Sequence, residues 1–221
     1  MRIVGRLPDR HGDELTARTR LRDAALECFA VDGFGVSVRV IAERAHVSPG
    51  LIRHHFGSKD ALRGECDEHA LSTLRRLKES ALSAPAGTFL AQLAQVRDYS
   101  AYVLYILRSV RDGGPAGRAF LEHMIADAET YTDSAVDAGI VRPSRDSRAR
   151  VRYLVMEGIG GLIVALGQHP KITMDNIGEV MTQIVAEVAL PRLELFTEGL
   201  LTDRRMLDEY LLYIGDPPAT A

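Results

Sequence analysis

Apolar residues recur three and four positions apart along most of this chain, the spacing that places side chains on one face of an α-helix. A first stripe consists of Leu21, Ala25, Cys28 and Phe29. It ends near Gly33, a residue suited to a helix C-terminus. Further along, glycines and prolines divide the chain into segments of helical length. The pattern predicts an all-α protein, with later helices over 59–82, 86–110, 116–138, 145–168, 174–199 and 203–214.

Residues 37–59, SVRVIAERAHVSPGLIRHHFGSK, predict two short helices joined by a tight turn. Val47 sits in the turn, Ser48 is a good N-cap and Pro49 a good first helical residue. His46 takes the turn position, where a positive φ is expected and His is tolerated at some cost. The first of these helices is expected to pack through the apolar face of Val38, Ile41, Ala42 and Ala45.

The second short helix is expected to face inward through Ile52 and Phe56, four residues apart. That arrangement leaves an outer face that is basic and polar. The free amides at the start of such a helix can bind phosphate, and its outer side chains can enter the major groove of DNA. The residues of that outer face are Leu51, Arg53, His54 and His55.

Charge is distributed unevenly along the chain. Residues 1–60 hold 10 Lys and Arg against 8 Asp and Glu, a net of +2, whereas the remainder holds 17 against 22, a net of −5. The overall net charge of −3 conceals this difference. A local basic patch on an acidic body is typical of a nucleic-acid-binding protein.

Residues 16–62 together resemble the N-terminal domain of the TetR (tetracycline repressor) family. The family spacing is matched by Phe29, Gly33, Phe34, Ser37, Val38, Ile41, Ala42, Val47, Ser48, Gly50, His55, Phe56, Ser58, Lys59 and Leu62. Two positions depart from the pattern, because the family usually has Tyr where this chain has Arg53 and often has Gly where it has His46. Arg53 could therefore read a base or hold a phosphate.

The resemblance implies a homodimeric transcription regulator that binds double-stranded operator DNA. By position, the implied DNA contacts are Ser37, Arg39, Ser48, Gly50, Arg53, His55 and Lys59. We expect Arg39 and Lys59 to contact phosphates. Base edges are expected to be read by Leu51, Arg53 and His54, since one Arg can bond guanine O6 and N7 together.

We divide the chain into a flexible arm (1–15), a helix-turn-helix domain (16–60), a helical effector-binding and dimerisation domain (61–215) and a tail (216–221). In the family, the eighth and ninth helices of two subunits form a four-helix bundle. The segments around 145–168 and 174–199 occupy those places, and Pro191 is expected to kink the second.

Large side chains in the C-terminal part suggest a pocket for a small lipophilic or aromatic effector. Three tyrosines follow one another at intervals of three, and other aromatic and Met residues lie nearby in the sequence. The candidate ligand residues are Tyr99, Tyr102, Tyr105, Phe120, Met124, Tyr153 and Met156. Taken singly, each of them is more simply explained as an ordinary core or interface residue.

No catalytic constellation is visible, and we expect neither a metal nor a cofactor. His123 and Asp127 have a helical ligand spacing but form too small a set. Cys28 and Cys66 lack metal spacing, and we interpret them as reduced packing residues of a cytoplasmic protein. No apolar run is long enough for a membrane span. Two alternatives remain: a constitutive DNA-binding regulator without an effector, and an all-α small-molecule-binding protein or enzyme that no longer binds DNA.

Overall fold

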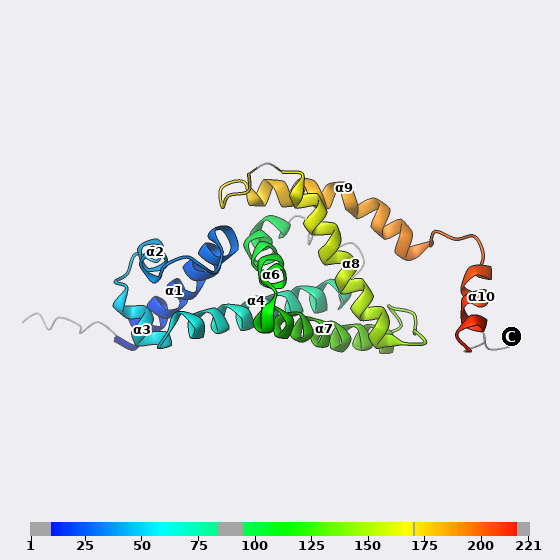
Figure 1. The fold of residues 1–221 in the computed structure, drawn as a ribbon, viewed down its shortest axis with the longest axis horizontal. Coiled ribbons are helices and arrows are strands. Elements are labelled where there is room, and N and C mark those ends of the chain that lie inside the picture. Colours follow the sequence, from blue (N-terminus) through cyan, green and yellow to red (C-terminus); the bar gives the residue numbers. More distant parts are fainter. Residues whose placement is uncertain (1–9, 84–94, 170, 216–221) are drawn as a thin grey trace, which may run out of the picture. The chain divides into compact units, whose positions relative to one another are not determined.

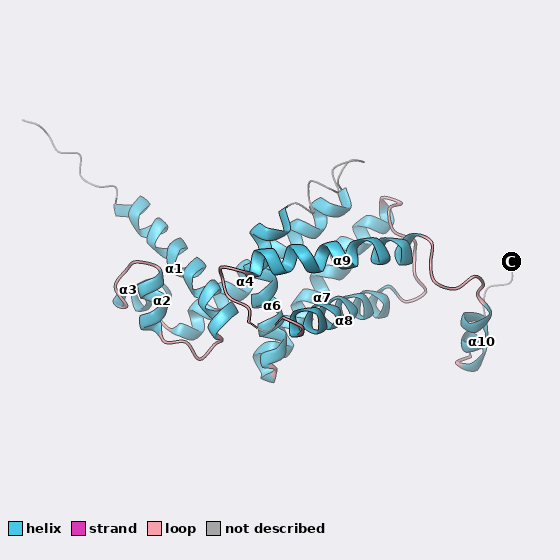
Figure 2. Ribbon diagram, turned by 90° about the horizontal axis from the view of Figure 1, so that it is seen from above, coloured by secondary structure: helices cyan, strands magenta, loops and turns pink. Residues whose placement is uncertain are grey.

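The computed structural model describes residues 10–83, 95–169 and 171–215, and within these ranges every regular element is a helix (Figures 1 and 2). The expected all-α fold is confirmed. The elements in chain order are α1 (Arg10–Asp32), α2 (Val38–Arg44), α3 (Gly50–Phe56), α4 (Lys59–Ser83), the 3₁₀ helix η1 (Gln95–Tyr99), α6 (Ser100–Asp112), α7 (Gly114–Asp137), α8 (Ser147–Gly167), α9 (Ile177–Thr197) and α10 (Arg205–Tyr213).

Most helix boundaries lie within a few residues of the predicted ones, but one predicted helix is wrong in part. The segment 86–110 was expected to be a single helix; its first residues lie outside the described ranges, and the rest is η1 followed by α6. The backbone changes at Tyr99, whose φ of −105° and ψ of 2° are not helical. The hydroxyl of Ser100 donates to the Arg97 carbonyl at 2.8 Å, and this bond stabilises the junction.

The N-terminal boundary also requires a correction. Helix α1 begins at Arg10, so residues 10–15 are helical rather than part of an arm. The last proline before the helix is Pro8, and residues 10–32 contain none. The remainder of the expected arm, residues 1–9, and the expected tail, 216–221, lie outside the described residues.

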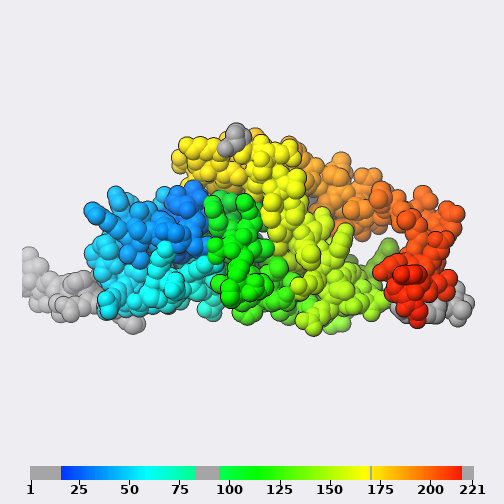
Figure 3. All heavy atoms as spheres, viewed as in Figure 1, coloured from blue at the N-terminus to red at the C-terminus, as the bar shows by residue number. Residues whose placement is uncertain are grey.

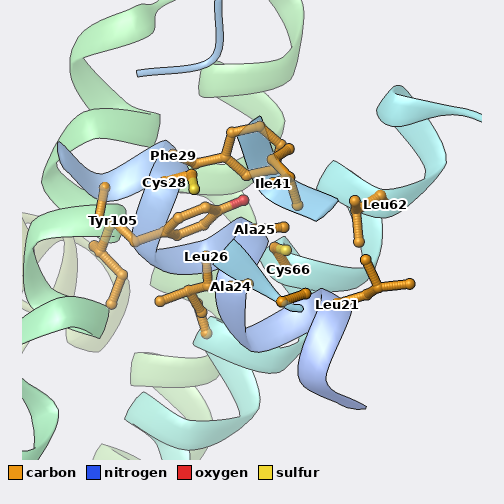
Figure 4. Close-up of a cluster of buried hydrophobic side chains, with 14 of the residues drawn as sticks. Leu21, Ala24, Ala25, Leu26, Cys28, Phe29, Ile41, Leu62, Cys66 and Tyr105 are labelled. Carbon is orange, nitrogen blue, oxygen red and sulfur yellow. The ribbon is translucent and has the colours of Figure 1, made fainter. Parts of the chain in front are cut away.

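A continuous apolar core joins α1, α2, α3 and α4 to α6 and α7 (Figure 4). Phe29 and Tyr105 are fully buried within it, with ring centroids 6.4 Å apart. Phe34 meets Tyr105 edge-on at 5.8 Å, and Phe120 does so at 6.4 Å. Helices α1 and α4, on which α2 and α3 pack, are therefore themselves packed directly against α6, and the surfaces of α1 and α6 meet in the space-filling view (Figure 3).

The packing divides the chain into two units, residues 1–182 and 183–221. The second unit contains the C-terminal part of α9, which remains helical through Pro191, and α10. No helix in the described ranges has the length and apolar character required to cross a membrane.

Candidate nucleic-acid interface

Helix α2 is built as its sequence predicts at its start and on most of its buried face. The hydroxyl of Ser37 accepts a hydrogen bond from the Val40 amide at 3.3 Å, so Ser37 caps the helix. Ile41 and Ala42 are fully buried. The prediction that Val38 belongs to the packing face is wrong, because Val38 lies in the first turn of α2 and is 37% exposed.

The turn between α2 and α3 has the expected backbone. His46 has a φ of 55° and is the only described non-glycine residue with a positive φ. Its amide donates to the Glu43 carbonyl, and the amide of Val47 donates to the Ala42 carbonyl, both at 3.0 Å. Val47 packs half-buried against the core and fills the space between the helices, as predicted.

Helix α3 begins one residue later than expected. Pro49 is its N-cap, and no side chain caps the helix, so the expected capping role of Ser48 is not observed. Ile52 is buried and Phe56 is half-buried, as the spacing predicts. The guanidinium of Arg18 lies 5.1 Å from the Phe56 ring centroid and packs over it.

The candidate DNA contacts lie together on α2, on α3 and at the start of α4. The exposed ones are Ser37, Arg39, Ser48, Gly50, Arg53 and His54, and the half-buried ones are Leu51, His55 and Lys59. Among the described residues, the side chains of Arg39, Arg53 and Lys59 have no hydrogen bond or ion pair with the protein. Three cations are thus available to an external anion.

Neighbouring arginines are held inside the protein. Arg44 lies 3.7 Å from the Glu27 carboxylate, and Arg18 lies 2.7 Å from Glu65. Arg44 and Arg18 therefore have carboxylate partners within the protein, whereas the cations on the outer face of the helix-turn-helix do not.

His55 differs from the other candidates because one ring nitrogen is buried. Its Nε2 has no hydrogen-bond partner among the described residues. The ring lies between those of His54, at 5.0 Å, and Phe56, at 6.3 Å. His55 is therefore less accessible to DNA than His54.

Sequence reasoning missed a row of polar contacts along α6, formed by Tyr102, Tyr105, Arg108 and Asp112. Arg108 donates to the backbone oxygens of Val31 at 2.8 Å and Ala30 at 3.3 Å, at the C-terminus of α1. The spacing of three, three and four residues was the available signal, because it places all four side chains on one face of a helix.

The other contacts of this row reach α4. The hydroxyl of Tyr105 donates to the Asp67 carboxylate at 2.6 Å, and Asp112 accepts from Arg63 at 3.1 Å. Tyr102 shares a hydrogen bond of 3.1 Å with His69. The row thus ties α6 to both long helices of the N-terminal part.

Burial governs the ionisation of these groups. It raises the pKa of the Asp67 carboxyl, against the opposing effects of the Tyr105 hydroxyl and the Arg63 guanidinium. Burial lowers the pKa of His69 and raises that of Tyr102, so both are held in their neutral forms.

The candidate ligand residues differ widely in burial. Tyr105, Phe120 and Met124 are buried in the core, and Tyr99 and Tyr102 are half-buried, whereas Tyr153 and Met156 are 67% and 56% exposed. Two cavities in the described part of the chain are lined by other residues. The first, of about 70 Å³, is lined by Glu79, Leu82, Tyr131, Ser134, Ala135, Ala138 and Ile140. The second, of about 320 Å³, lies within residues 201–209.

Metal-binding and nucleophilic groups are similarly dispersed. No three His, Cys, Asp or Glu side chains converge as a metal site in the described ranges. His123 is exposed, and Asp127 is paired with Arg75. Cys28 and Cys66 are free thiols fully buried in the core, and burial raises the pKa of both.

The fold and the exposed helix-turn-helix define a helical DNA-binding transcription regulator. Residues 21–66 match the family of bacterial regulatory proteins called the tetR family, and residues 97–202 match the tetracyclin repressor-like C-terminal domain. The chain belongs to the TetR family of transcriptional regulators.

Related proteins agree with this assignment. The chain is 43% identical over 199 residues to the HTH-type transcriptional regulatory protein RaaS of Mycobacterium tuberculosis, covering 90% of this chain and 93% of RaaS. It is 46% identical over 46 residues to the HTH-type transcriptional regulator UidR of Escherichia coli, covering 20% of this chain and 24% of UidR. These relatives are named as regulators and not as enzymes.

Solved structures share the fold at low sequence identity. A tetR-family transcriptional regulator from Streptomyces coelicolor superposes with a TM-score of 0.55 at 18% identity, covering 91% of this chain and 90% of that chain. The regulator PfmR from Thermus thermophilus superposes with a TM-score of 0.53 at 21% identity, covering 84% and 98%.

Proposed function

We propose that this regulator is a homodimeric repressor that binds a near-palindromic operator and is released by a small lipophilic or aromatic effector. Dimerisation is assigned to the segments around 145–168 and 174–199, which contain α8 and α9. Two recognition helices would then enter successive major grooves roughly 34 Å apart.

The observation that carries DNA binding is the freedom of three cations on the helix-turn-helix. Arg39, Arg53 and Lys59 have no protein partner among the described residues, although nearby arginines do. Internal ion pairs at Arg53 and Lys59 would have favoured a protein that no longer binds DNA. Their availability favours phosphate contacts by Arg39 and Lys59, and base reading by Leu51, Arg53 and His54.

Response to an effector is supported by the contacts of α6. Because Arg108, Tyr105 and Asp112 bond α6 to α1 and α4, a ligand that displaces α6 would also move the helix-turn-helix. A ligand lowers DNA affinity only if it binds the displaced arrangement more tightly. Tyr99, Tyr102, Tyr153 and Met156 are the candidate residues with accessible surface.

The burial of Tyr105, Phe120 and Met124 favours a second candidate, a constitutive regulator without an effector. The two candidates differ in one measurement. Compounds that release operator DNA from the protein, and whose own binding is weakened reciprocally by the operator, would establish the effector-responsive form. Failure of a lipophilic and aromatic library to release DNA would favour the constitutive one.

Two single substitutions and one control test the DNA interface. Arg53→Ala should weaken specific binding by roughly 1–3 kcal/mol if Arg53 reads a base, with little change on random DNA. An equal loss on both would make Arg53 a phosphate contact. Lys59→Ala should reduce the salt dependence of binding by about one phosphate contact. The matched control is Lys171→Ala, which removes an exposed charge outside the helix-turn-helix and should leave the slope unchanged.

A further inference from the structure

Helix α10 presents an apolar stripe that has no partner among the described residues of its own unit, 183–215. Its exposed members are Met206 (68%), Leu207 (48%), Tyr210 (60%), Tyr213 (86%) and Ile214 (50%). They follow the spacing of one helix face, and Arg205, Asp208 and Glu209 lie on the other. Leu211 is the single buried residue of the helix.

The C-terminal part of α9 is exposed in a similar way. Its large apolar residues at the surface are Val188, Leu190, Leu193, Leu195 and Phe196. At about 100° per residue they extend over roughly 220° of the helix circumference, whereas one contact face needs about 100°. This part of α9 therefore requires more than one neighbouring helix.

Within the second unit, α10 does not supply that neighbour in its own chain. The apolar residues of α9 and those of α10 are all exposed there, and residues 198–204 join the two helices as a non-helical segment (Figure 1). Each chain thus has two exposed apolar surfaces, one on α10 and one on α9. In a dimer, the surface on α10 of one copy can cover the surface on α9 of the other. Seven residues can extend about 23 Å, which is enough to cross to an adjacent subunit.

The size of the stripe agrees with a protein interface. Its five exposed side chains present about 600 Å² of mainly apolar surface, at the upper limit for a monomer. A stable interface buries about 800 Å² on each partner. The stripe together with the exposed residues of α9 reaches that area.

Charge argues against a lipid surface as the occupant. Helices that lie on membranes carry an excess of Lys and Arg on the polar face. Here the charges of Arg204 and Arg205 are balanced by Asp208 and Glu209, and the helix contains no Lys. The match to the family C-terminal domain ends at residue 202, so α10 lies beyond the part of the chain that this match covers.

We propose that α10 is an arm that packs its apolar stripe on the C-terminal part of α9 in a second copy of this chain. The inference rests on the proposed homodimer and adds a contact outside the bundle assigned to α8 and α9. Each subunit gives one arm and receives one, so the contact is made twice in a symmetric dimer.

Sedimentation equilibrium of the full chain tests this contact. Y210E/Y213E should raise the dimer dissociation constant at least tenfold. Leu212→Glu is the matched control, because Leu212 is 63% exposed but lies on the polar side of α10, and it should leave that constant unchanged. Equal dissociation constants for all three proteins would overturn the arm while leaving the dimer intact. A monomeric wild type would overturn both the dimer and the arm.

Cross-linking from the arm identifies its partner. Tyr213→Cys can be labelled selectively with a benzophenone maleimide, because the native thiols of Cys28 and Cys66 are buried. Cross-links between two chains, mapped to the C-terminal part of α9, are expected. Cross-links within one chain would overturn the proposal. So would cosedimentation with vesicles of phosphatidylcholine and phosphatidylglycerol that Y210E/Y213E abolishes.

Discussion

Arg108 of α6 donates a hydrogen bond from Nη2 to the backbone oxygen of Val31, 2.8 Å away, and so closes the C-terminus of α1 with a positive charge. The last carbonyls of a helix lack partners within it, and a cation there also interacts favourably with the helix dipole. The contact joins residues 77 positions apart and ties α6 to α1, the helix on which α2 packs.

Arg108→Ala should lower the free energy of unfolding by about 1–2 kcal/mol, because it removes charge-assisted bonds to two carbonyls. Urea denaturation at a fixed protein concentration measures this change. Arg111→Ala, an exposed cation in the last turn of α6, serves as control and should change stability by less than about 0.5 kcal/mol. Equal effects of the two substitutions would contradict the capping role.

The half-buried Asp67 carboxyl should make stability depend on pH. Its pKa is raised above the ordinary 3.8 by burial, so the native state holds its proton to higher pH than the unfolded state does. The free energy of unfolding therefore falls as pH rises from 3.8 through the raised value. Asp67→Asn should remove this component in a pH series of urea titrations.

Glu68→Gln changes the next residue of α4, which is exposed, and should leave the pH series unchanged. Tyr105→Phe should widen the pH window, since the Tyr105 hydroxyl lowers the pKa of Asp67. The assignment of a raised pKa to Asp67 would be contradicted if Asp67 made the free energy of unfolding rise with pH over this window, as judged against Asp67→Asn.

His46 occupies a left-handed conformation that costs an ordinary residue about 1–2 kcal/mol. His46→Gly should therefore raise the free energy of unfolding by about 1 kcal/mol, after the larger chain entropy of Gly in the unfolded state is included. Thermal denaturation measures it. Glu43→Gly, in the last turn of α2, should have the opposite sign and cost up to about 1 kcal/mol. Destabilisation by His46→Gly would show that the imidazole makes a contact of its own.

Gly117 allows α7 to approach α6 closely. A Cβ at this position would lie 2.7 Å from the Ser109 carbonyl oxygen, a backbone atom that cannot move aside. Gly117→Ala should therefore cost about 1–3 kcal/mol of stability. Gly64→Ala, where a Cβ would meet nothing within 4 Å, should stabilise α4 by up to about 1 kcal/mol. If urea titrations show that both substitutions change the free energy of unfolding in the same direction, this account is contradicted.

The helices and the helix-turn-helix could be predicted because the relevant signals are local. Helical spacing of apolar residues, the cap at Ser37 and the positive φ at His46 depend on neighbours a few residues away. Residues 10–15 were missed because a helix-compatible polar segment resembles an arm when no apolar stripe is present.

Contacts between distant helices could not be read in the same way. The bonds of Arg108 and Tyr105 join segments 38 to 78 residues apart, and no local pattern specifies them. The candidate effector residues show a related limit. An aromatic residue at helical spacing can fill a core, as Tyr105 does, or remain at the surface, as Tyr153 does. Helical spacing gives the face of a helix and not what covers it.

The most direct test of the central claim is the selection of randomised duplex DNA by the purified full-length protein, followed by sequencing. A dimeric regulator that reads bases with Arg53 and His54 should enrich an inverted repeat, with half-sites about one helical turn apart. Arg53→Ala should then relax the preference at one position of each half-site. Absence of any enriched sequence, at low and at moderate salt, would contradict sequence-specific DNA recognition by this helix-turn-helix.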